Sequence, residues 1–258
     1  MTSQDLFSLR GKTVLITGAS SGLGAHFASL LAANGAKLVL CARQPDKMGV
    51  VADKIAAASG CAPFCLQVDV ASETGVEAVF ATLAEKGVMI DVMVNNAGIA
   101  AAGAALDLPI DSFDAVMATN LRGVWLMATH AARHWQKAGR PGAIVNIASI
   151  LGERVASSVA PYSASKAAVI QLTKALALEW ARHGIRVNAL APGYIATRIN
   201  DDFFGTAQGA AMLKRIPMRR LGHASELDGA MLLLCSEASS FMTGAVLAVD
   251  GGHLVSGL

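Results

Sequence analysis

The sequence predicts an α/β protein built on one doubly wound parallel sheet, with helices on both faces. Short apolar runs rich in Val, Ile and Leu alternate with stretches of helical periodicity along the 258 residues. Hydrophobic residues make up 53% of the chain and charged residues only 16%, which suits a sheet that is buried on both faces. No Pro/Ser-rich linker interrupts the alternation, so we expect a single domain over residues 1–258.

The alternation begins with one βαβαβ unit. Strands are expected at residues 12–17, 37–41 and 64–68, and helices at 23–34 and 46–59, ended by Gly35 and Gly60. The pattern continues with helices at 73–85, 112–136 and 162–183 and strands at 91–94, 143–148 and 186–190. Strands that alternate with helices in this way are typical of a parallel sheet with right-handed crossovers.

The regular pattern lapses after Pro192-Gly193. Residues 195–221 form the longest irregular stretch, and we expect a substrate lid over 194–221, with a surface loop as the alternative interpretation. Ser225 is then expected to cap another helix, with Asp228 three residues later, and a last strand is expected at 245–249.

Charge and cysteine usage narrow the classes of function. The net charge is +2 and the basic residues are scattered, so no nucleic-acid partner is expected. No apolar run reaches the length of a membrane span and the first ten residues lack a secretory pattern, so we expect a cytoplasmic protein without membrane contact.

The histidines form no ligand cluster, so no metal is expected. Cys41, Cys61, Cys65 and Cys235 are interpreted as reduced core thiols, and the spacing leaves a Cys61–Cys65 contact open.

A glycine-rich turn, residues 17–24, lies between the first expected strand and the first helix. Gly18 would permit a sharp turn, Gly22 a close approach of a pyrophosphate to the backbone, and Gly24 close packing of the helix. Amides at a helix start bind anions. The spacing Gly-x-x-x-Gly-x-Gly departs from the usual dinucleotide fingerprint, so the turn alone is also compatible with an ordinary glycine-rich loop.

The end of the second expected strand bears on cofactor choice. A carboxylate there would accept hydrogen bonds from a ribose and repel a 2′-phosphate, and this chain has Ala42 at that place. Arg43 follows, and its guanidinium suits a phosphate monoester, so NADP(H) is favoured and NAD(H) remains possible. The alternative is that Arg43 stacks on adenine or forms a surface ion pair.

Tyr162 and Lys166 are candidate catalytic residues. The interval of four residues places the phenol and the amine on one face of the expected helix. A nearby cation is expected to lower the pKa of the phenol, which makes it a usable acid or base at neutral pH. Ser149 ends the preceding expected strand and could hydrogen-bond a substrate carbonyl, with a turn or cap serine as the alternative.

These residues together resemble the short-chain dehydrogenase/reductase family. The resemblance rests on residues 17–24, Asn95-Asn96-Ala97-Gly98, Asn120, Ser149, Tyr162, Lys166 and Pro192-Gly193, which occur in the family's order and approximate spacing. It implies a Rossmann-like fold of seven parallel strands. It also implies that Tyr162 is the proton donor or acceptor, Ser149 anchors the carbonyl, and Lys166 holds the nicotinamide ribose. Asn120 would be the helix-kink residue that holds a water in the proton relay.

The resemblance also implies a cofactor-binding set. It assigns Asp69 to the adenine edge, Asn96 and Gly98 to the cofactor cradle, and Ile195 and Thr197 to the nicotinamide carboxamide, although Asp69 could be a strand-end cap and Thr197 a loop stabiliser. With Arg43, the expected set is Gly18, Ser20, Ser21, Gly22, Leu23, Gly24, Arg43, Asp69, Val70, Asn96, Ala97, Gly98, Tyr162, Lys166, Pro192, Gly193, Ile195 and Thr197.

The expected reaction is the reversible reduction of a ketone or a 3-oxoacyl-type carbonyl to a secondary alcohol, with NADP(H). The expected pocket walls, residues 99–104, 150–155 and 194–204, are mostly small or apolar, which favours a ketone, a thioester or a neutral polyol over a free acid. Arg154 and Arg198 are the exceptions. The alternatives are an NAD-dependent alcohol, sugar or polyol dehydrogenase and a non-catalytic nucleotide-binding regulator. Family likeness suggests a homotetramer, to which residues 241–258 and the long helices offer apolar surfaces.

Overall fold

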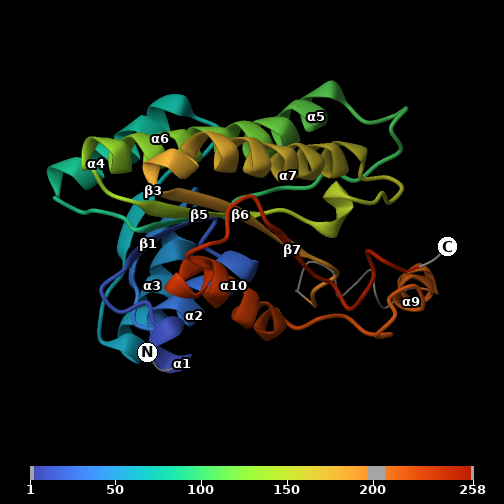
Figure 1. Cartoon of the computed structure of the whole chain (residues 1–258). Helices are drawn as coiled ribbons and strands as arrows, with labels where there is room; N and C mark the ends of the chain where they lie inside the picture. Colours follow the sequence, from blue (N-terminus) through green and yellow to red (C-terminus); the bar gives the residue numbers. More distant parts are fainter. Residues whose placement is uncertain (1–2, 197–206, 257–258) are drawn as a thin grey trace.

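The computed structural model describes residues 3–196 and 207–256 (Figure 1). Within these residues the protein forms one sheet of seven strands in the order β3-β2-β1-β4-β5-β6-β7, and every pair of neighbours is parallel. The strands are β1 (Thr13–Thr17), β2 (Lys37–Ala42), β3 (Phe64–Gln67), β4 (Val92–Asn95), β5 (Gly142–Ile147), β6 (Ile185–Pro192) and β7 (Val246–Val249). The expected fold class is confirmed.

Helices cover both faces of this sheet (Figure 1). One layer consists of α4 (Glu73–Glu85), α5 (Ile110–Met117), α6 (Gly123–Lys137) and α7 (Ala160–Trp180). The other consists of α2 (Gly22–Ala33), α3 (Pro45–Ser59) and α10 (Asp228–Cys235), with α1 (Ser3–Leu6) near the N-terminus and α9 (Ala207–Leu213) beyond the carboxyl edge of the sheet.

The strands form because their apolar side chains alternate between two cores. In β1, Val14 and Ile16 belong to the core beneath α2 and α10, whereas Leu15 belongs to the core beneath α4 and α6. In β5, Val145 belongs to the core beneath α2 and α10, and Ile144 belongs to the core beneath α4 and α6. Both faces of the sheet are therefore buried, which explains why the strands are continuous apolar runs in the sequence.

The strand order reverses between β1 and β4. The chain builds outward from β1 to β2 and β3, then crosses to the other side of β1 to build β4, β5, β6 and β7. In open parallel sheets this reversal leaves a crevice outside the carboxyl ends of the two central strands, and ligands bind there. The residues that follow β1 and β4 are the glycine turn and the Asn-Asn-Ala-Gly segment.

Three segments differ from the sequence expectation. The expected helix over 112–136 is two helices joined by a π-helical turn, Ala118–Arg122. The expected cap at Ser225 is wrong, because a 3-10 turn begins earlier and His223 is its N-cap; the backbone N–H of His223 donates to Glu226 at 2.8 Å. The stretch 195–221 is not wholly irregular, since α9 lies within it.

The cysteines divide into two classes, which corrects their interpretation as four core thiols. Cys41 and Cys235 are buried, and burial raises the pKa of each thiol to about 12. Cys61 is exposed and Cys65 is only half-buried. All four are free thiols.

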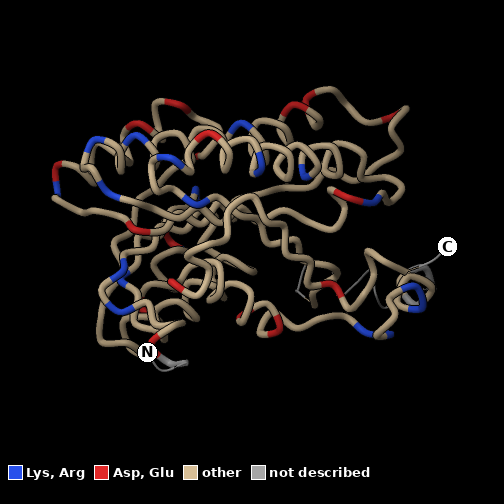
Figure 2. Tube along the Cα trace, viewed as in Figure 1, with Lys and Arg blue, Asp and Glu red and all other residues tan. Residues whose placement is uncertain are grey.

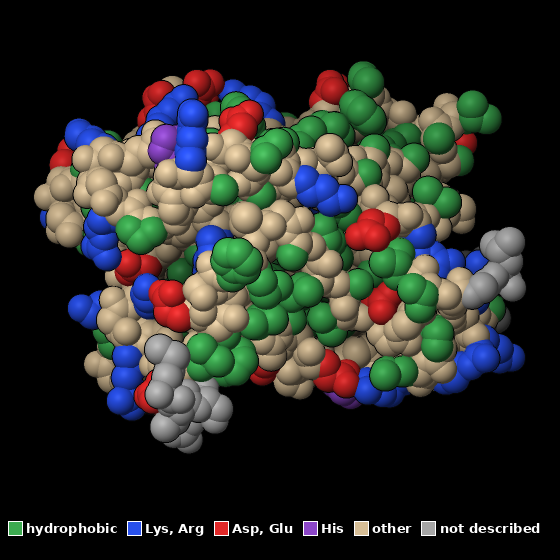
Figure 3. All heavy atoms as spheres, viewed as in Figure 1, with side chains coloured by type: hydrophobic (Ala, Val, Ile, Leu, Met, Phe, Trp, Pro, Cys, Tyr) green, Lys and Arg blue, Asp and Glu red, His purple; other side chains and the backbone are tan. Residues whose placement is uncertain are grey.

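Among the described residues, Lys and Arg are interspersed with Asp and Glu along the chain trace (Figure 2). On the face shown in Figure 3, hydrophobic side chains gather over α10 and β7. Among the residues described, no helix has both the length and the apolar character needed to cross a bilayer.

Candidate active site

The glycine turn after β1 adopts a conformation that requires glycine. Gly18 has a φ of +66° and Gly22 a φ of +55°, both in the left-handed region that favours glycine. A Cβ on Gly24 would lie 2.2 Å from the Gly18 carbonyl oxygen and 2.5 Å from Asn96 Nδ2. The start of α2 therefore approaches the turn as closely as only glycine allows.

The N-terminus of α2 is open to an anion. Ser21 is the N-cap residue, and its side chain makes no capping hydrogen bond. A Cβ on Gly22 would meet no atom within 4 Å, so free space lies in front of the turn. An uncapped helix start that faces open space, on a glycine backbone, fits the pyrophosphate of a dinucleotide.

A cleft of about 320 Å³ runs from this turn across the ends of β2, β3 and β4. Its lining includes these expected cofactor-binding residues: Gly18, Ser20, Ser21, Gly22, Leu23, Gly24, Arg43, Asp69, Val70, Asn96, Ala97 and Gly98. It also includes Cys41, Ala42, Gln44, Val68, Ile99 and Thr119, which the sequence reasoning did not assign to the cofactor. The structure thus brings most of the expected set to one cleft.

The side chain of Arg43 is exposed at the rim of this cleft, directly after β2. No carboxylate of the described residues lies within 4.0 Å of it, so these residues do not form the surface ion pair that was the alternative interpretation of Arg43. Asp69 Oδ1 accepts a hydrogen bond from the Ala71 N–H at 3.0 Å, so it caps the turn after β3 while it lines the cleft. The cap interpretation and the cofactor interpretation of Asp69 are therefore compatible.

Ser149 follows β5 and caps a short 3-10 turn, Ile150–Gly152. Its Oγ accepts a hydrogen bond from the Leu151 N–H at 3.1 Å, and the residue is 8% exposed. A Cβ on Gly152 would lie 2.8 Å from the Lys166 carbonyl oxygen, so this turn packs directly against α7. Because the cap fixes the Ser149 side chain beside α7, its hydroxyl is held close to Tyr162, with which it shares a hydrogen bond.

Tyr162 and Lys166 share one face of α7, as the spacing predicts. Lys166 Nζ lies 5.6 Å from the centre of the Tyr162 ring and donates a hydrogen bond to the Ile147 carbonyl oxygen at 2.7 Å. Lys166 is 4% exposed, so its amine is removed from water. Ile147 ends β5 two residues before Ser149, and the three candidate catalytic residues therefore meet at the carboxyl end of one strand.

Burial is the largest cause of the pKa shifts of Tyr162 and Lys166. It raises the pKa of the Tyr162 phenol above its usual 10.0, and the hydrogen bond with Ser149 opposes only part of that rise. Burial also lowers the pKa of the Lys166 amine from 10.5 to about 8. The sequence expectation of a lowered phenol pKa is thus wrong for the chain by itself, since burial raises the pKa of Tyr162.

Asn120 lies in the π-helical turn between α5 and α6 and is fully buried. Its Nδ2 donates to the Ile99 carbonyl oxygen at 2.8 Å and to Ser165 Oγ at 3.0 Å, and its Oδ1 accepts from the Ile99 N–H at 2.8 Å. A Cβ on Gly98 would lie 3.3 Å from Asn120 Oδ1 and 3.6 Å from Lys166 Nζ. Asn120 therefore ties the cleft loop to α7, and π-helical turns are frequent at functional sites.

Some expected site residues lie elsewhere. Pro192, Gly193 and Ile195 are not among the described residues that line the cleft. Ile195 is buried, pairs with Gly222 and lines a separate cavity beside Asp250. Val155, expected in the substrate wall, is 85% exposed. Thr197, Arg198 and residues 201–204 of the expected lid lie outside the described residues.

Two residues at the site were not singled out by the sequence analysis. Ser165 Oγ donates to the Tyr162 carbonyl oxygen at 2.7 Å and accepts from Asn120, so it joins the two expected catalytic positions. Thr17 Oγ1 accepts hydrogen bonds from the N–H groups of Asn96 and Ala97 at 3.0 and 3.1 Å, which links the ends of β1 and β4. Thr17 directly follows the apolar run of β1, and a small polar residue at that place is the signal that could have revealed it.

Comparison with known proteins agrees with this geometry. A family model described as Enoyl-(Acyl carrier protein) reductase matches residues 18–253. A solved short-chain type dehydrogenase/reductase from Mycobacterium marinum superposes with a TM-score of 0.91 at 40% identity, over 98% of this chain and 99% of that one. This chain is a short-chain dehydrogenase/reductase. It is an oxidoreductase that acts on alcohols or ketones with NAD(P).

Similar members of this family act on a sugar acid. Gluconate 5-dehydrogenase of Gluconobacter oxydans (strain 621H) is 39% identical over 257 residues, which are 99% of this chain and 100% of the relative. The solved gluconate 5-dehydrogenase of Burkholderia cenocepacia J2315, in complex with NADP and tartrate, has a TM-score of 0.94 at 38% identity. That match covers 99% of this short-chain dehydrogenase/reductase and 100% of the solved chain.

Proposed function

We propose that this protein is an NADP(H)-dependent dehydrogenase that interconverts a secondary alcohol and a ketone on a polyhydroxylated small molecule. The observation that carries the proposal is the meeting of Ser149, Tyr162 and Lys166 at the end of β5, beside a cleft lined by the glycine turn. The similarity to gluconate 5-dehydrogenases supports the class of substrate.

Each of the three residues has a separate role in the proposal. Ser149 holds the substrate oxygen, because its hydroxyl lies beside the phenol at the open end of the strand. Tyr162 gives a proton to that oxygen in reduction and removes it in oxidation. Lys166 has three N–H donors, and Ile147 accepts from one, so two stay available for a ribose and for the substrate side of the site.

The cofactor, when bound in this cleft, supplies or accepts the hydride. The protein's own contribution is to orient the reactants and to control the proton. Because burial raises the pKa of Tyr162, the phenol is protonated at neutral pH and is ready to donate in reduction. Oxidation of the alcohol requires the phenolate form of Tyr162. The rate of oxidation should therefore rise as the pH increases toward the pKa of this phenol.

Arg43 supports NADP(H) over NAD(H). Its guanidinium lines the cleft after β2 without a carboxylate partner among the described residues, and Ala42 replaces the acidic residue that would repel a 2′-phosphate. The B. cenocepacia relative was solved with NADP. Arg43 is the one cationic residue among the described residues of the cleft, so the choice between the 2′-phosphate of NADP(H) and the 2′-hydroxyl of NAD(H) rests on it.

Arg154 extends the proposal to sugar acids. The sequence analysis favoured neutral substrates and named Arg154 as one of two exceptions in the expected pocket walls. In the structure its guanidinium donates to the His253 carbonyl oxygen and to Ser256 Oγ, and it acts electrostatically on Tyr194, which in turn acts on Tyr162. These partners are neutral acceptors, so the charge of Arg154 can bind a carboxylate at the substrate end of the site.

The proposal is tested by a panel of gluconate, galactitol, glycerol and an acetoacetyl thioester, each assayed with NADP(H) and NAD(H). We expect turnover of gluconate or a polyol with NADP(H), and Arg154→Gln should raise KM for gluconate about tenfold or more while leaving KM for galactitol unchanged. Turnover of the thioester alone, or stronger activity with NAD(H), would replace the proposal with one of the alternatives.

A homotetramer is also proposed. An apolar cavity between the π-helical turn, α6 and α7 is lined by Leu121, Trp125 and Leu172, and Trp125 is 47% exposed. Phe241 is wholly exposed, and hydrophobic side chains gather over α10 and β7 (Figure 3). Apolar surface of this kind suits association with further copies. Light scattering on the purified protein should give about four times the chain mass of 26.5 kDa; a monomer mass would refute the assembly.

A further inference from the structure

A run of basic residues lies between α9 and the 3-10 turn Ala224–Leu227. Residues 214–220 include four cations and no carboxylate: Lys214, Arg215, Arg219 and Arg220. Figure 2 shows Lys and Arg gathered beside α9, which lies beyond the carboxyl edge of the sheet in Figure 1. Because the net charge of the chain is only +2, this segment is a local concentration of positive charge.

Among the described residues, three of these cations have no carboxylate partner. Arg220 is paired with Glu226, and each of two guanidinium nitrogens lies 2.6 Å from a carboxylate oxygen. No described carboxylate lies within 4.0 Å of the other three, which we call the basic rim: Lys214, Arg215 and Arg219. All three are exposed. Their charge therefore extends into the solvent over about 10 Å at 0.1 M salt.

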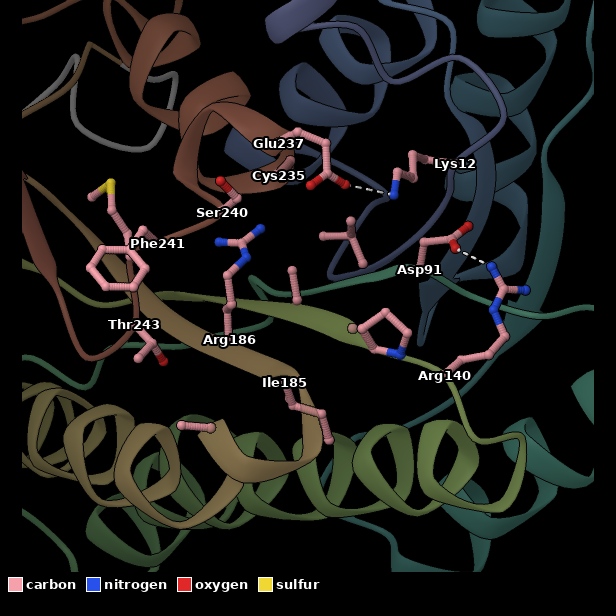
Figure 4. A pocket seen from close by; sticks show the side chains of 17 residues that line it. Lys12, Asp91, Arg140, Ile185, Arg186, Cys235, Glu237, Ser240, Phe241 and Thr243 are labelled. Carbon is pink, nitrogen blue, oxygen red and sulfur yellow. Dashed lines mark hydrogen bonds and ion pairs between the residues drawn. The ribbon is translucent and has the colours of Figure 1, made fainter.

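The cations at the opposite, amino edge of the sheet lie close to carboxylates. In the hollow between the first residues of β4, β5 and β6, Lys12 pairs with Glu237 at 2.9 Å (Figure 4). Arg140 pairs with Asp91 at 3.0 Å in the same hollow, and the charge of Glu237 also acts on Arg186. Paired charges largely cancel at a distance, so this edge attracts an anion in solution far less than the basic rim does.

The backbone at Arg219 holds a cation where glycine would fit better. Its φ is +56°, in the left-handed region that favours glycine. Among the described residues, Ser158 is the one other non-glycine residue with a positive φ. Arg219 Nη1 donates to the Lys214 carbonyl oxygen, so the side chain folds back toward the end of α9 and stays beside the other cations of the rim. Backbone strain of this kind is frequent where a side chain has a function.

The basic rim lies against the C-terminal segment that Arg154 holds. The Met218 N–H donates to the Gly251 carbonyl oxygen at 3.2 Å. Arg154 donates to the carbonyl oxygen of His253, two residues later. Burial lowers the pKa of His253, and the charges of Arg154 and Arg215 lower it further. Arg215 is therefore within electrostatic reach of the segment beside which Arg154 is proposed to bind a carboxylate.

This segment adjoins the catalytic site. The His253 ring lies 5.4 Å from the Tyr194 ring, and Tyr194 acts electrostatically on Tyr162. Asp250 is a carboxylate that acts on His253, and its two oxygens each accept a hydrogen bond from a backbone N–H. Among the described residues, this bonded carboxylate stands against Arg154 and the three cations of the basic rim. The substrate end of the site therefore has a positive potential.

We propose that the basic rim draws an anionic sugar acid from solvent toward Arg154 and so favours anionic over neutral substrates. This inference rests on the proposed function, which supplies the reaction and the carboxylate. Arg154 acts by contact, whereas the basic rim acts through its field and touches no reacting atom. Its contribution should therefore appear in kcat/KM, leave kcat unchanged and fall as salt screens the charges.

The test is the triple variant Lys214→Gln/Arg215→Gln/Arg219→Gln, assayed with saturating NADP⁺ at ionic strengths of about 20 and about 300 mM. For the wild type, we expect kcat/KM for gluconate to be about three- to tenfold lower at the higher ionic strength. The triple variant should show that lower value at both ionic strengths. Galactitol is uncharged, so its kcat/KM should change neither with salt nor with the substitutions. If gluconate binds without turnover, its inhibition constant against galactitol is measured in the same way.

The matched control is Lys86→Gln/Lys137→Gln/Arg182→Gln, which removes three exposed cations at the amino edge of the sheet. These residues precede β4, β5 and β6. The control changes the net charge by the same amount as the basic-rim variant, but far from the substrate end. It should keep the wild-type kcat/KM for gluconate at both ionic strengths.

Three results would overturn the inference and leave the dehydrogenase intact: a wild-type kcat/KM for gluconate in the basic-rim variant, an equal loss in the control variant, or an equal loss with galactitol. If the triple variant does not fold, Lys214→Gln/Arg215→Gln replaces it and should show a smaller loss of the same kind. No turnover of any substrate of the panel by the wild type would instead refute the proposed function on which the inference rests.

Discussion

The buried amine of Lys166 should make the stability of the cofactor-free protein depend on pH. The unfolded chain holds the lysine proton up to about pH 10.5, whereas the folded chain releases it near pH 8. Between these values the unfolded state binds more protons, so the free energy of unfolding rises with pH. At a pH where the amine is charged in both states, the change of its pKa from 10.5 to about 8 lowers the free energy of unfolding by about 3 kcal/mol.

The perturbation that isolates this effect is Lys166→Met, which keeps the length of the side chain and removes the charge. Urea unfolding of wild type and variant at pH 7 and pH 10 gives the difference in the free energy of unfolding at each pH. We expect that difference to shift by about 2.5 kcal/mol in favour of the wild type between pH 7 and pH 10. Lys174→Met, at an exposed position on the same helix, is the matched control and should show no such shift. A constant difference for Lys166→Met would refute the assignment of a desolvated, charged amine at this site.

Two further substitutions test the cofactor cleft. Gly24→Ala places a Cβ 2.2 Å from the Gly18 carbonyl oxygen. Urea unfolding should therefore show that the free energy of unfolding falls by about 1–3 kcal/mol, and dinucleotide binding should weaken. Gly49→Ala is the control, because its Cβ would meet no atom within 4 Å, and it should be neutral or slightly stabilising. A Gly24→Ala variant as stable as Gly49→Ala would contradict the close approach. Arg43→Ala should raise the Kd for NADPH roughly 10- to 100-fold and leave that for NADH unchanged in a fluorescence titration, and equal effects on both would show that Arg43 does not bind the 2′-phosphate.

The sheet could be predicted from sequence because its strands are buried on both faces. Val14, Leu15 and Ile16 form a continuous apolar run because both faces of the sheet are buried there, and Gly18 follows the end of the strand. The shared helix face of Tyr162 and Lys166 could also be predicted, because residues four apart lie on one face of any α-helix.

Other features depend on contacts that local sequence does not encode. The π-helical turn at Asn120 exists because its amide pairs with the backbone of Ile99, twenty-one residues away. The raised pKa of Tyr162 reflects burial, which pairwise spacing cannot supply. The exposure of Cys61 and the attachment of Arg154 to the C-terminal segment likewise follow from the folded arrangement of distant residues.

Replacement of Tyr162 by Phe tests the central claim most directly, because it removes one hydroxyl and leaves the ring. The chain contains two tyrosines, so Tyr194→Phe is a matched control. With the best substrate of the panel, Tyr162→Phe should lower kcat by roughly 10²–10⁴-fold while the Kd for NADPH stays unchanged, and Tyr194→Phe should retain most of the turnover. Wild-type turnover in Tyr162→Phe would contradict the role of its phenol as the group that carries the proton.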